Sequence, residues 1–214
     1  IEETMAALHD LVRDGKVRYI GVSDTPAWKV TEAQLIARFS GFTQFIGLQI
    51  EYSLLERTVE GELVPMAQAL GMGVTPWSPL RGGVLSGKFT RANAGKVEAS
   101  KRSWVGNIDE STYKVIDELQ KIAGEVDSTV ARVALAWVQG RPGVSSTIIG
   151  ARTLAQLDDN LAALDVKLGA DQVARLDALT KPRLNFPADF LGMAGMIHAG
   201  GTVINGEASQ MSGF

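Results

Sequence analysis

The stretch that decides the fold is Gly71–Lys88, which reads GMGVTPWSPLRGGVLSGK. Val74–Trp77 has the pattern of a short buried strand, and Pro79, Gly82 and Gly83 indicate that the chain turns directly after it. A strand that opens into a glycine-rich loop ending in a lysine suits an anion, because backbone N–H groups and a positive charge can face it. The stretch therefore predicts a phosphate-binding loop.

Two other interpretations of this loop have to be weighed. Gly82–Lys88 fits the start of the nucleotide-triphosphatase loop GxxxxGK[ST], but Phe89 stands where that motif needs a hydroxyl group for magnesium. The sequence therefore argues against a nucleotide triphosphatase. The simpler alternative is a solvated turn between a strand and a helix. A phosphate-binding loop is favoured over this turn only if other segments indicate the same ligand.

Composition narrows the class of protein. The chain has 214 residues, 45% of them hydrophobic and 21% charged, with a net charge of −3, which is typical of an ordinary soluble globular protein. Interspersed charges argue against a nucleic-acid or membrane surface. The absence of cysteine excludes disulfides and thiol catalysis, and His9 and His198 are not spaced as a ligand pair, so we expect no metal site. A cytoplasmic enzyme or binding protein is the default expectation.

Short apolar strands alternate with helices along the chain. The predicted strands are Val17–Val22, Phe45–Ile50, Val74–Trp77 and Ser146–Ile149. The helical pattern begins around Met5–Val12 and predicts further helices at Trp28–Phe39, Glu62–Leu70, Glu110–Val126, Thr129–Gln139, Thr153–Leu164 and Ala170–Leu179. This alternation predicts a parallel sheet with helical crossovers.

A parallel sheet of this kind is either an open doubly wound sheet or part of a (β/α)₈ barrel. The dinucleotide fingerprint GxGxxG follows none of the strands, which weighs against the first. Polar residues follow each predicted strand, at the carboxyl end where barrel enzymes carry their sites. Four strands are half of the eight that a barrel requires, so the sequence predicts an α/β fold that is roughly half a barrel.

Four blocks of sequence carry a resemblance to a known family. They are GKVRYIGVSD (15–24), LQIEYSLLER (48–57), TPWSPLRGGVLSGKF (75–89) and IIGARTLAQLDDNL (148–161). In order and spacing the chain resembles the aldo-keto reductases, particularly the branch with bacterial reductases and the β subunits of voltage-gated potassium channels. The resemblance covers Ile1 to about Lys181. It implies that residues 1–214 form the second half of a (β/α)₈ TIM barrel, with 181–214 as a variable tail and the N-terminal half absent.

The resemblance also implies that NADPH binds across the carboxyl ends of the strands. The residues implied at the nicotinamide are Ser23, Asp24 and Gln49 on the carboxamide and Trp77 stacked on the ring. Those implied at the pyrophosphate are Ser78, Pro79, Leu80, Gly82 and Leu85, with Lys88 to neutralise it. Those implied at the adenosine end are Arg102, then Gly150, Arg152 and Gln156 around the 2′-phosphate, and Asp159 and Asn160 on the adenine. Asp24 departs from the more usual Asn and replaces an amide that can donate by an acceptor.

The family's catalytic set does not match any part of this chain. In the family a Tyr protonates the carbonyl, supported by Lys, Asp and His, and all four precede the helix with which this sequence begins. We therefore assign no catalytic residue. The expected activity of the parent protein is NADPH-dependent reduction of a small aldehyde or ketone, with this chain alone inactive. The alternatives are a redox-sensing nucleotide-binding subunit, like the channel β subunits, and an inactive truncated product.

Half a barrel has physical consequences that the structure can test. It would expose two strand edges and the apolar inward face of the sheet. We expect the missing strands to exist in the real molecule. The alternatives are a homo-oligomer in which two copies pair edge to edge, and a chain that folds poorly. The sheet should be curved and four-stranded, with Val17–Val22 and Ser146–Ile149 at opposite ends and helices on one face only. The apolar tail, with Phe186, Phe190, Met193 and Met196, indicates only that part of the substrate is apolar.

Overall fold

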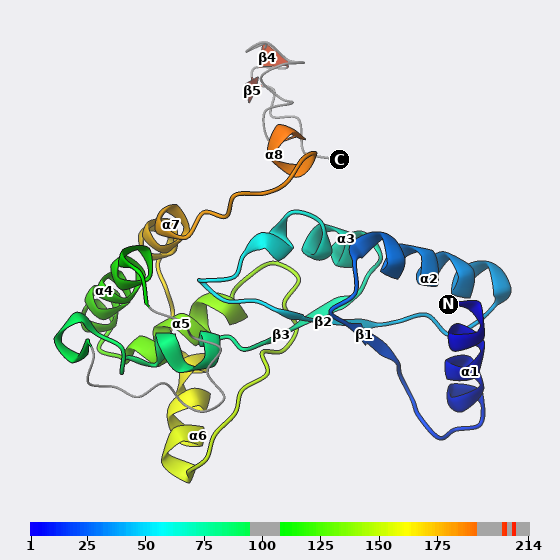
Figure 1. Ribbon diagram of the computed structural model, residues 1–214, viewed down its shortest axis with the longest axis horizontal. Coiled ribbons are helices and arrows are strands. Elements are labelled where there is room, and N and C mark those ends of the chain that lie inside the picture. Colours follow the sequence, from blue (N-terminus) through cyan, green and yellow to red (C-terminus); the bar gives the residue numbers. More distant parts are fainter. Residues whose placement is uncertain (95–107, 192–202, 205–206, 209–214) are drawn as a thin grey trace.

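The computed structural model describes residues 1–94, 108–191, 203–204 and 207–208, and its centre is a parallel sheet (Figure 1). The strands β1 (Gly21–Ser23), β2 (Gly47–Glu51) and β3 (Gly73–Trp77) lie side by side in chain order. Their register places Ser23 beside Gln49 and Gln49 beside Thr75. The predicted α/β class with parallel pairing is confirmed, and the carboxyl ends of the three strands meet at one edge.

The predicted helices are present. They are α1 (Glu2–Arg13), α2 (Ala27–Ser40), α3 (Leu63–Ala69), α4 (Glu110–Glu125), α5 (Val130–Gln139), α6 (Leu154–Leu161) and α7 (Ala170–Leu179). The main difference lies after α6, where a 3₁₀ helix, η4 (Ala162–Asp165), replaces the last predicted turn. The tail contains α8 (Ala188–Leu191) and the short antiparallel pair β4 (Val203–Ile204) and β5 (Glu207–Ala208).

Local sequence explains where several of these helices begin and end. Asp109, Thr129 and Thr153 each accept a hydrogen bond from a backbone N–H of the first turn of α4, α5 and α6. Such side-chain caps satisfy donors that the helix itself cannot pair. Helix α2 ends at Gly41, whose φ of 70° is a left-handed conformation that glycine adopts without strain.

The two faces of the sheet have different surroundings. Leu48, Ile50 and Val74 are buried on one face, and helices α2 and α3 lie along this side (Figure 1). Alternate residues of β2 and β3, such as Gln49 and Thr75, point to the other face, where they line an open pocket of about 420 Å³. One covered and one open face is the arrangement that the sequence predicts.

The fourth predicted strand is wrong as an element, although its chain lies in the expected place. Residues 143–148 follow β3: the N–H of Val74 donates to the carbonyl of Gly143 (2.9 Å), and the N–H of Ser145 returns to Val74 (2.9 Å). The pairing becomes irregular at Pro76, which has no N–H to donate, although its carbonyl still accepts from the N–H of Ile148 (2.8 Å). The N–H of Thr147 bonds instead to the side chain of Gln139 (3.0 Å). In the described residues the sheet therefore has three regular strands and an irregular fourth segment.

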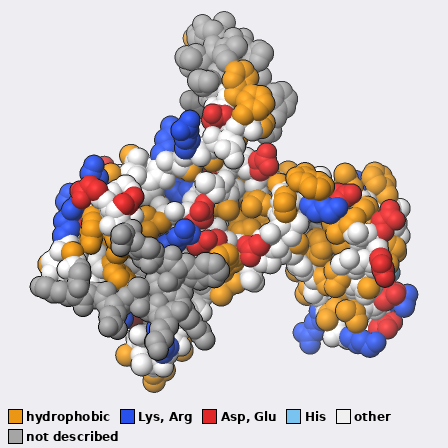
Figure 2. Space-filling model, in the orientation of Figure 1, with side chains coloured by type: hydrophobic (Ala, Val, Ile, Leu, Met, Phe, Trp, Pro, Cys, Tyr) orange, Lys and Arg blue, Asp and Glu red, His pale blue; other side chains and the backbone are white. Residues whose placement is uncertain are grey.

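Strand β1 is also shorter than the predicted Val17–Val22. In the part of the chain that the structure describes it has a neighbour on one side only, and its pairing begins where the N–H of Ile46 donates to the carbonyl of Ile20 (3.0 Å). Tyr19, just before this point, is 71% exposed. Apolar side chains also lie on the surface around α1 and α2 (Figure 2). Trp28 and Phe39 of α2 are both largely exposed.

The core under the sheet continues to one side, where α4, α5 and α7 pack together. Val133, Ala134 and Val138 of α5 are fully buried, as the nearly all-apolar sequence of this helix predicts. They belong to the same core as Leu119 of α4 and Leu176 of α7. This packing sets the position of the N-terminus of α5, which matters for the site below.

Candidate functional site

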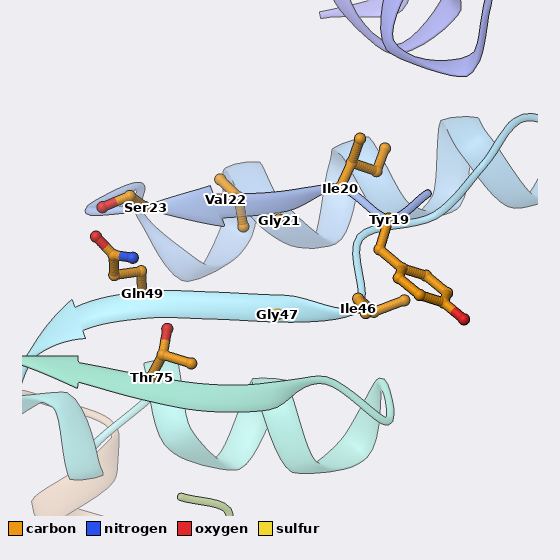
Figure 3. Close-up of a pocket in the computed structure, with 9 residues that line it drawn as sticks. All are labelled: Tyr19, Ile20, Gly21, Val22, Ser23, Ile46, Gly47, Gln49 and Thr75. Carbon is orange, nitrogen blue, oxygen red and sulfur yellow. The ribbon is translucent and has the colours of Figure 1, made fainter. Parts of the chain in front are cut away.

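Polar side chains gather where the three strands end, and we call Ser23, Asp24, Gln49, Trp77 and Ser78 the rim. Ser23 and Gln49 are exposed neighbours in the register of β1 and β2. Figure 3 shows their side chains pointing toward one another at the carboxyl end of the open pocket. The pocket is lined by Tyr19, Ile20, Gly21, Val22, Ser23, Ile46, Gly47, Gln49 and Thr75. The structure thus brings Ser23 and Gln49 together, as predicted for two residues that share one ligand.

Asp24 joins the ends of all three strands. Its backbone, at φ 47°, donates to the carbonyl of Gln49 in β2 (3.1 Å). Its carboxylate accepts from Ser23 Oγ (3.0 Å) and from Trp77 Nε1 at the end of β3 (3.0 Å). The expected contact of Asp24 with a carboxamide stays a prediction, whereas the protein itself supplies two donors to its carboxylate.

The glycine-rich loop after Trp77 differs from the sequence expectation in how its amides are used. The N–H groups of Arg81 and Gly82 donate to the carbonyl and hydroxyl of Ser78 (2.8 and 3.1 Å). Those of Gly83 and Leu85 both donate to the carbonyl of Leu80 (3.0 and 3.1 Å). The expectation of free amides is therefore wrong for these four residues, because the loop folds as the 3₁₀ helix η2 (Arg81–Ser86). The exposed Lys88 follows it as a cationic donor.

Glycines are required in this loop by its backbone. Gly82 and Gly83 have φ values of 62° and 99°, a region that costs other residues free energy. Pro79 is buried and Leu80 packs against the core, so both act as anchors of the turn. Leu85 is also fully buried. The predicted pyrophosphate-wrapping residues thus lie on one tight, internally bonded turn at the end of β3.

An ion pair that the sequence did not reveal ties this loop to the sheet. The guanidinium of Arg81 contacts the carboxylate of Glu51, the last residue of β2. Glu51 is the register partner of Trp77, so the pair spans the step from β2 to the loop after β3. The sequence signal for this contact is a pair of opposite charges, one just after the second predicted strand and one in the loop after the third.

The adenosine-end residues surround the start of α6. Two of their amides shape this turn: Gln156 Oε1 accepts from the N–H of Arg152 (2.9 Å), and Asn160 Nδ2 donates to the carbonyl of Gly150 (3.3 Å). The Arg152 side chain is exposed, and no ion pair engages it within the described ranges. The turn therefore presents a guanidinium to solvent. Arg102 lies outside the described residues.

Asp159 has a partner in the protein rather than an open carboxylate. Arg132 of α5 donates to it from Nε at 2.7 Å. At the other side of the same helix end, Gly87 lies against Val130: a Cβ added to the glycine would come within 3.3 Å of the valine. The first turns of α5 thus contact both the glycine-rich loop and α6. This brings the predicted pyrophosphate and adenosine segments together, and Arg132 is the residue that sequence reasoning missed.

No tyrosine of the chain lies at the rim. Tyr19 lines the pocket at the end away from Ser23 and Gln49 (Figure 3). Tyr113 lies on α4 with the guanidinium of Arg91 5.1 Å from its ring centroid. Tyr52 is buried and donates to Glu60 (2.6 Å). Burial raises the pKa of the Tyr52 phenol, and the hydrogen bond to Glu60 adds to the rise.

Tyr52 belongs to a cluster that we call the Trp137 network. The guanidinium groups of Arg57 and Arg141 lie 5.0 and 4.7 Å from the centroid of the buried Trp137 ring. Asp177 of α7 accepts from Trp137 Nε1 (3.1 Å) and forms ion pairs with both arginines. The network consists of Tyr52, Arg57, Glu60, Trp137, Arg141 and Asp177, and it joins the end of β2 to α5 and α7.

In the described part of the chain, no group of His, Cys, Asp or Glu residues has the arrangement of a metal site. None of the described helices has the length and apolar character that crossing a membrane requires.

Comparison with known proteins places these residues in a wider context. The sequence model of the aldo/keto reductase family matches residues 1–181. The uncharacterized oxidoreductase YrpG of Bacillus subtilis is 38% identical over 176 residues, which cover 82% of this chain and 53% of YrpG. The aryl-alcohol dehydrogenase [NADP(+)] of Phanerodontia chrysosporium is 34% identical over 87% of this chain and 50% of its own length. The norsolorinic acid reductase of Aspergillus flavus is 33% identical, with coverages of 89% and 47%. The chain spans about half the length of these curated relatives.

Proposed function

The chain belongs to the aldo/keto reductase family, and from this premise we propose that it binds NADPH across the carboxyl ends of its strands. The nicotinamide lies at the rim, the pyrophosphate over the glycine-rich loop, and the 2′-phosphate at the turn before α6. The observation that carries this proposal is the pair of exposed side chains Ser23 and Gln49, which converge at the end of the sheet with Trp77 beside them.

The rim has the donors and acceptors that a nicotinamide carboxamide needs. Gln49 offers both an amide N–H and a carbonyl oxygen, and Ser23 offers a hydroxyl. The Trp77 indole bonds to Asp24 after β1, so it reaches from β3 past the end of β2. An aromatic ring near two polar side chains can stack on a flat heterocycle while they bind its amide. These features support the nicotinamide placement.

The turn before α6 supports a preference for NADPH over NADH. Arg152 presents a planar group with several N–H donors, which match the oxygens of a phosphate. Its backbone is fixed by Gln156, so the guanidinium projects from an ordered turn. Lys88 supplies a further positive charge near the pyrophosphate loop. The name of the Phanerodontia chrysosporium relative, which includes NADP(+), agrees with this choice.

We further propose that this chain takes part in the reduction of an aldehyde or ketone to an alcohol. The bound cofactor supplies the hydride in such a reaction. The residues of this chain hold the nicotinamide and present one face of its ring, with Trp77 covering the other. A second group must protonate the carbonyl oxygen. Tyr52 is buried and Tyr19 lies at the pocket end away from Ser23 and Gln49, which supports an acid other than the tyrosines of this chain. Because one relative is named as an aryl-alcohol dehydrogenase, we propose aromatic carbonyl compounds as the substrate class of this chain.

The cofactor proposal is tested by titrating the chain with NADPH and with NADH, monitored by nicotinamide fluorescence. Replacing Arg152 by Ala should weaken NADPH binding by roughly 1–3 kcal/mol, the range for hydrogen bonds to charged groups, and leave NADH binding nearly unchanged. Arg13→Ala, an exposed arginine on α1, is the matched control and should change neither. Equal losses for both cofactors would show that Arg152 does not bind the 2′-phosphate.

The proposal that this chain binds the cofactor but does not supply the catalytic acid is tested by assaying the purified 214-residue chain for NADPH-dependent reduction of an aromatic aldehyde. We expect cofactor binding without turnover, because the rim holds the nicotinamide and provides no tyrosine acid. Steady turnover that copurifies with the chain and disappears in Gln49→Ala would show that the chain contains its own acid.

A further inference from the structure

We propose that Asp24 is a positioning residue, which fixes the Trp77 indole as the platform for the nicotinamide and sets the hydrogen-bonding role of Ser23. The inference rests on the proposed cofactor binding and goes beyond it, because the resemblance implies only a direct contact between Asp24 and the carboxamide. The geometry of the rim gives the Asp24 carboxylate a different task.

The hydrogen bond that holds the Trp77 indole goes to Asp24. It is the last residue of β3 and is only partly buried, in contrast to its buried neighbour Pro76. A partly exposed side chain at the end of a strand can adopt several rotamers. The bond from Nε1 to Asp24 Oδ1, at 3.0 Å, selects the one in which the indole extends toward β1. A hydrogen bond to a carboxylate is stronger than one between neutral groups, which suits this role.

Asp24 can hold the indole because its own position is fixed. Its N–H donates to the carbonyl of Gln49, and its φ of 47° turns the chain sharply after β1. The Thr25 hydroxyl bonds to the carbonyl of Ser23 (2.9 Å) and closes the same turn. The acceptor for Trp77 is thus carried by a tight turn that is itself bonded to the central strand.

The same carboxylate decides what Ser23 can offer a ligand. The Ser23 hydroxyl donates its single proton to Asp24 Oδ2 at 3.0 Å. Its lone pairs therefore remain for an incoming N–H, such as that of a carboxamide NH₂ group. The neighbouring Gln49 can then donate to the carboxamide oxygen. Asp24 in this way makes Ser23 an acceptor and Gln49 the donor.

The test compares NADPH with adenosine 2′,5′-bisphosphate, which has the 2′-phosphate end and no nicotinamide. Asp24→Gly is the informative variant, since glycine tolerates the φ of 47° while removing the carboxylate. We expect it to weaken NADPH binding on the order of tenfold, the scale of one charge-assisted hydrogen bond, and to leave bisphosphate binding unchanged. Asp24→Asn keeps an oxygen for Trp77 Nε1 and should restore most of the NADPH affinity.

A double-variant cycle tests whether Asp24 acts through Trp77. Trp77→Phe keeps an aromatic ring and removes the N–H donor. Adding Asp24→Gly to it should cost clearly less than tenfold further, because only the effect through Ser23 remains and coupled residues are not additive. An ¹⁵N spectrum of the unliganded chain contains an indole N–H signal for each of the four tryptophans, and the signal that disappears in Trp77→Phe belongs to Trp77. Asp24→Gly should shift this signal more than the other three. This readout does not depend on the cofactor.

The outcomes separate the inference from the function on which it rests. Selective loss of NADPH affinity, rescue by Asn and non-additivity with Trp77→Phe support the positioning role. An equal loss for both ligands, a full tenfold loss in the Trp77→Phe background, or an unmoved Trp77 indole signal overturns it. If the unaltered chain binds neither NADPH nor the bisphosphate, the proposed function itself fails and the positioning role fails with it.

Discussion

Two polar clusters of opposite character share the segment around the end of β2, where Gln49 belongs to one cluster and Tyr52 to the other. Gln49 of the rim is exposed, and its side chain faces Ser23 across an open pocket. Tyr52 of the Trp137 network is 1% exposed and bonds to Glu60 and Arg141. Both clusters contain a tryptophan whose N–H donates to an aspartate, Trp77 to Asp24 and Trp137 to Asp177.

The difference lies in how many of the polar groups are already paired. In the Trp137 network each charge has an opposite charge nearby and the indole lies between two guanidinium groups, so the cluster stabilises the fold. At the rim, Gln49 and Ser23 retain capacity for further hydrogen bonds and remain exposed. Changes in the network should therefore alter stability, and changes at the rim should alter ligand binding.

The largest effect is expected for Trp137→Ala. The ring is 2% exposed and carries both cation–π contacts, so its loss leaves a cavity and removes these contacts from the two arginines. The free energy of unfolding should fall by about 3–5 kcal/mol, the usual cost of truncating a buried Trp. Urea unfolding followed by circular dichroism measures this change. A loss below about 1 kcal/mol would remove the distinction between the two clusters.

A smaller effect is expected from high pH, through Tyr52. The pKa of its phenol is higher in the folded state than in the unfolded state, where a tyrosine ionises at about pH 10. Between these two pKa values the unfolded chain loses the proton while the folded chain keeps it. The stabilisation is complete below about pH 10 and decreases above it, by about 1.4 kcal/mol per pH unit. The difference in unfolding free energy between the chain and Tyr52→Phe should shrink over this range. If this difference in unfolding free energy stays constant from about pH 9 to about pH 11, the account is contradicted.

The smallest effect on stability is expected for Gln49→Ala at the rim. The side chain is exposed, so the free energy of unfolding should change by less than about 0.5 kcal/mol. NADPH binding should nevertheless weaken by about 1–2 kcal/mol, because the carboxamide loses a partner. Calorimetric titration and urea unfolding of the same preparation give both numbers. A substantial loss of stability with unchanged affinity would assign Gln49 to the fold rather than to the ligand.

Much of the fold could be predicted because it depends on local patterns. Alternating short strands and helices predicted the parallel sheet. Two predicted helices began at Thr129 and Thr153, which the structure shows to be the N-caps of α5 and α6. The fourth strand was mispredicted because its outcome depends on groups elsewhere in the chain. Pro76 on the neighbouring strand cannot donate, and Gln139 of α5 takes the N–H of Thr147.

The candidate site was predictable where it follows from strand ends and not where it depends on pairing between distant side chains. Ser23 and Gln49 lie together because parallel strands end at one edge. The bond between Asp24 and Trp77 joins residues 53 apart in sequence, and no local pattern indicates it. The same holds for the ion pair of Arg132 with Asp159, which a single sequence shows only as two separate charges.

The most direct test of the central claim is an ¹⁵N spectrum of the chain, with assigned backbone signals, recorded as NADPH is added. The account predicts that the amide signals of Ser23, Gln49 and Trp77 shift in a saturable way, while those of Arg57, Trp137 and Asp177 stay in place. Saturable shifts confined to the Trp137 network, or none at the rim, would contradict the claim that NADPH binds at the open ends of the strands.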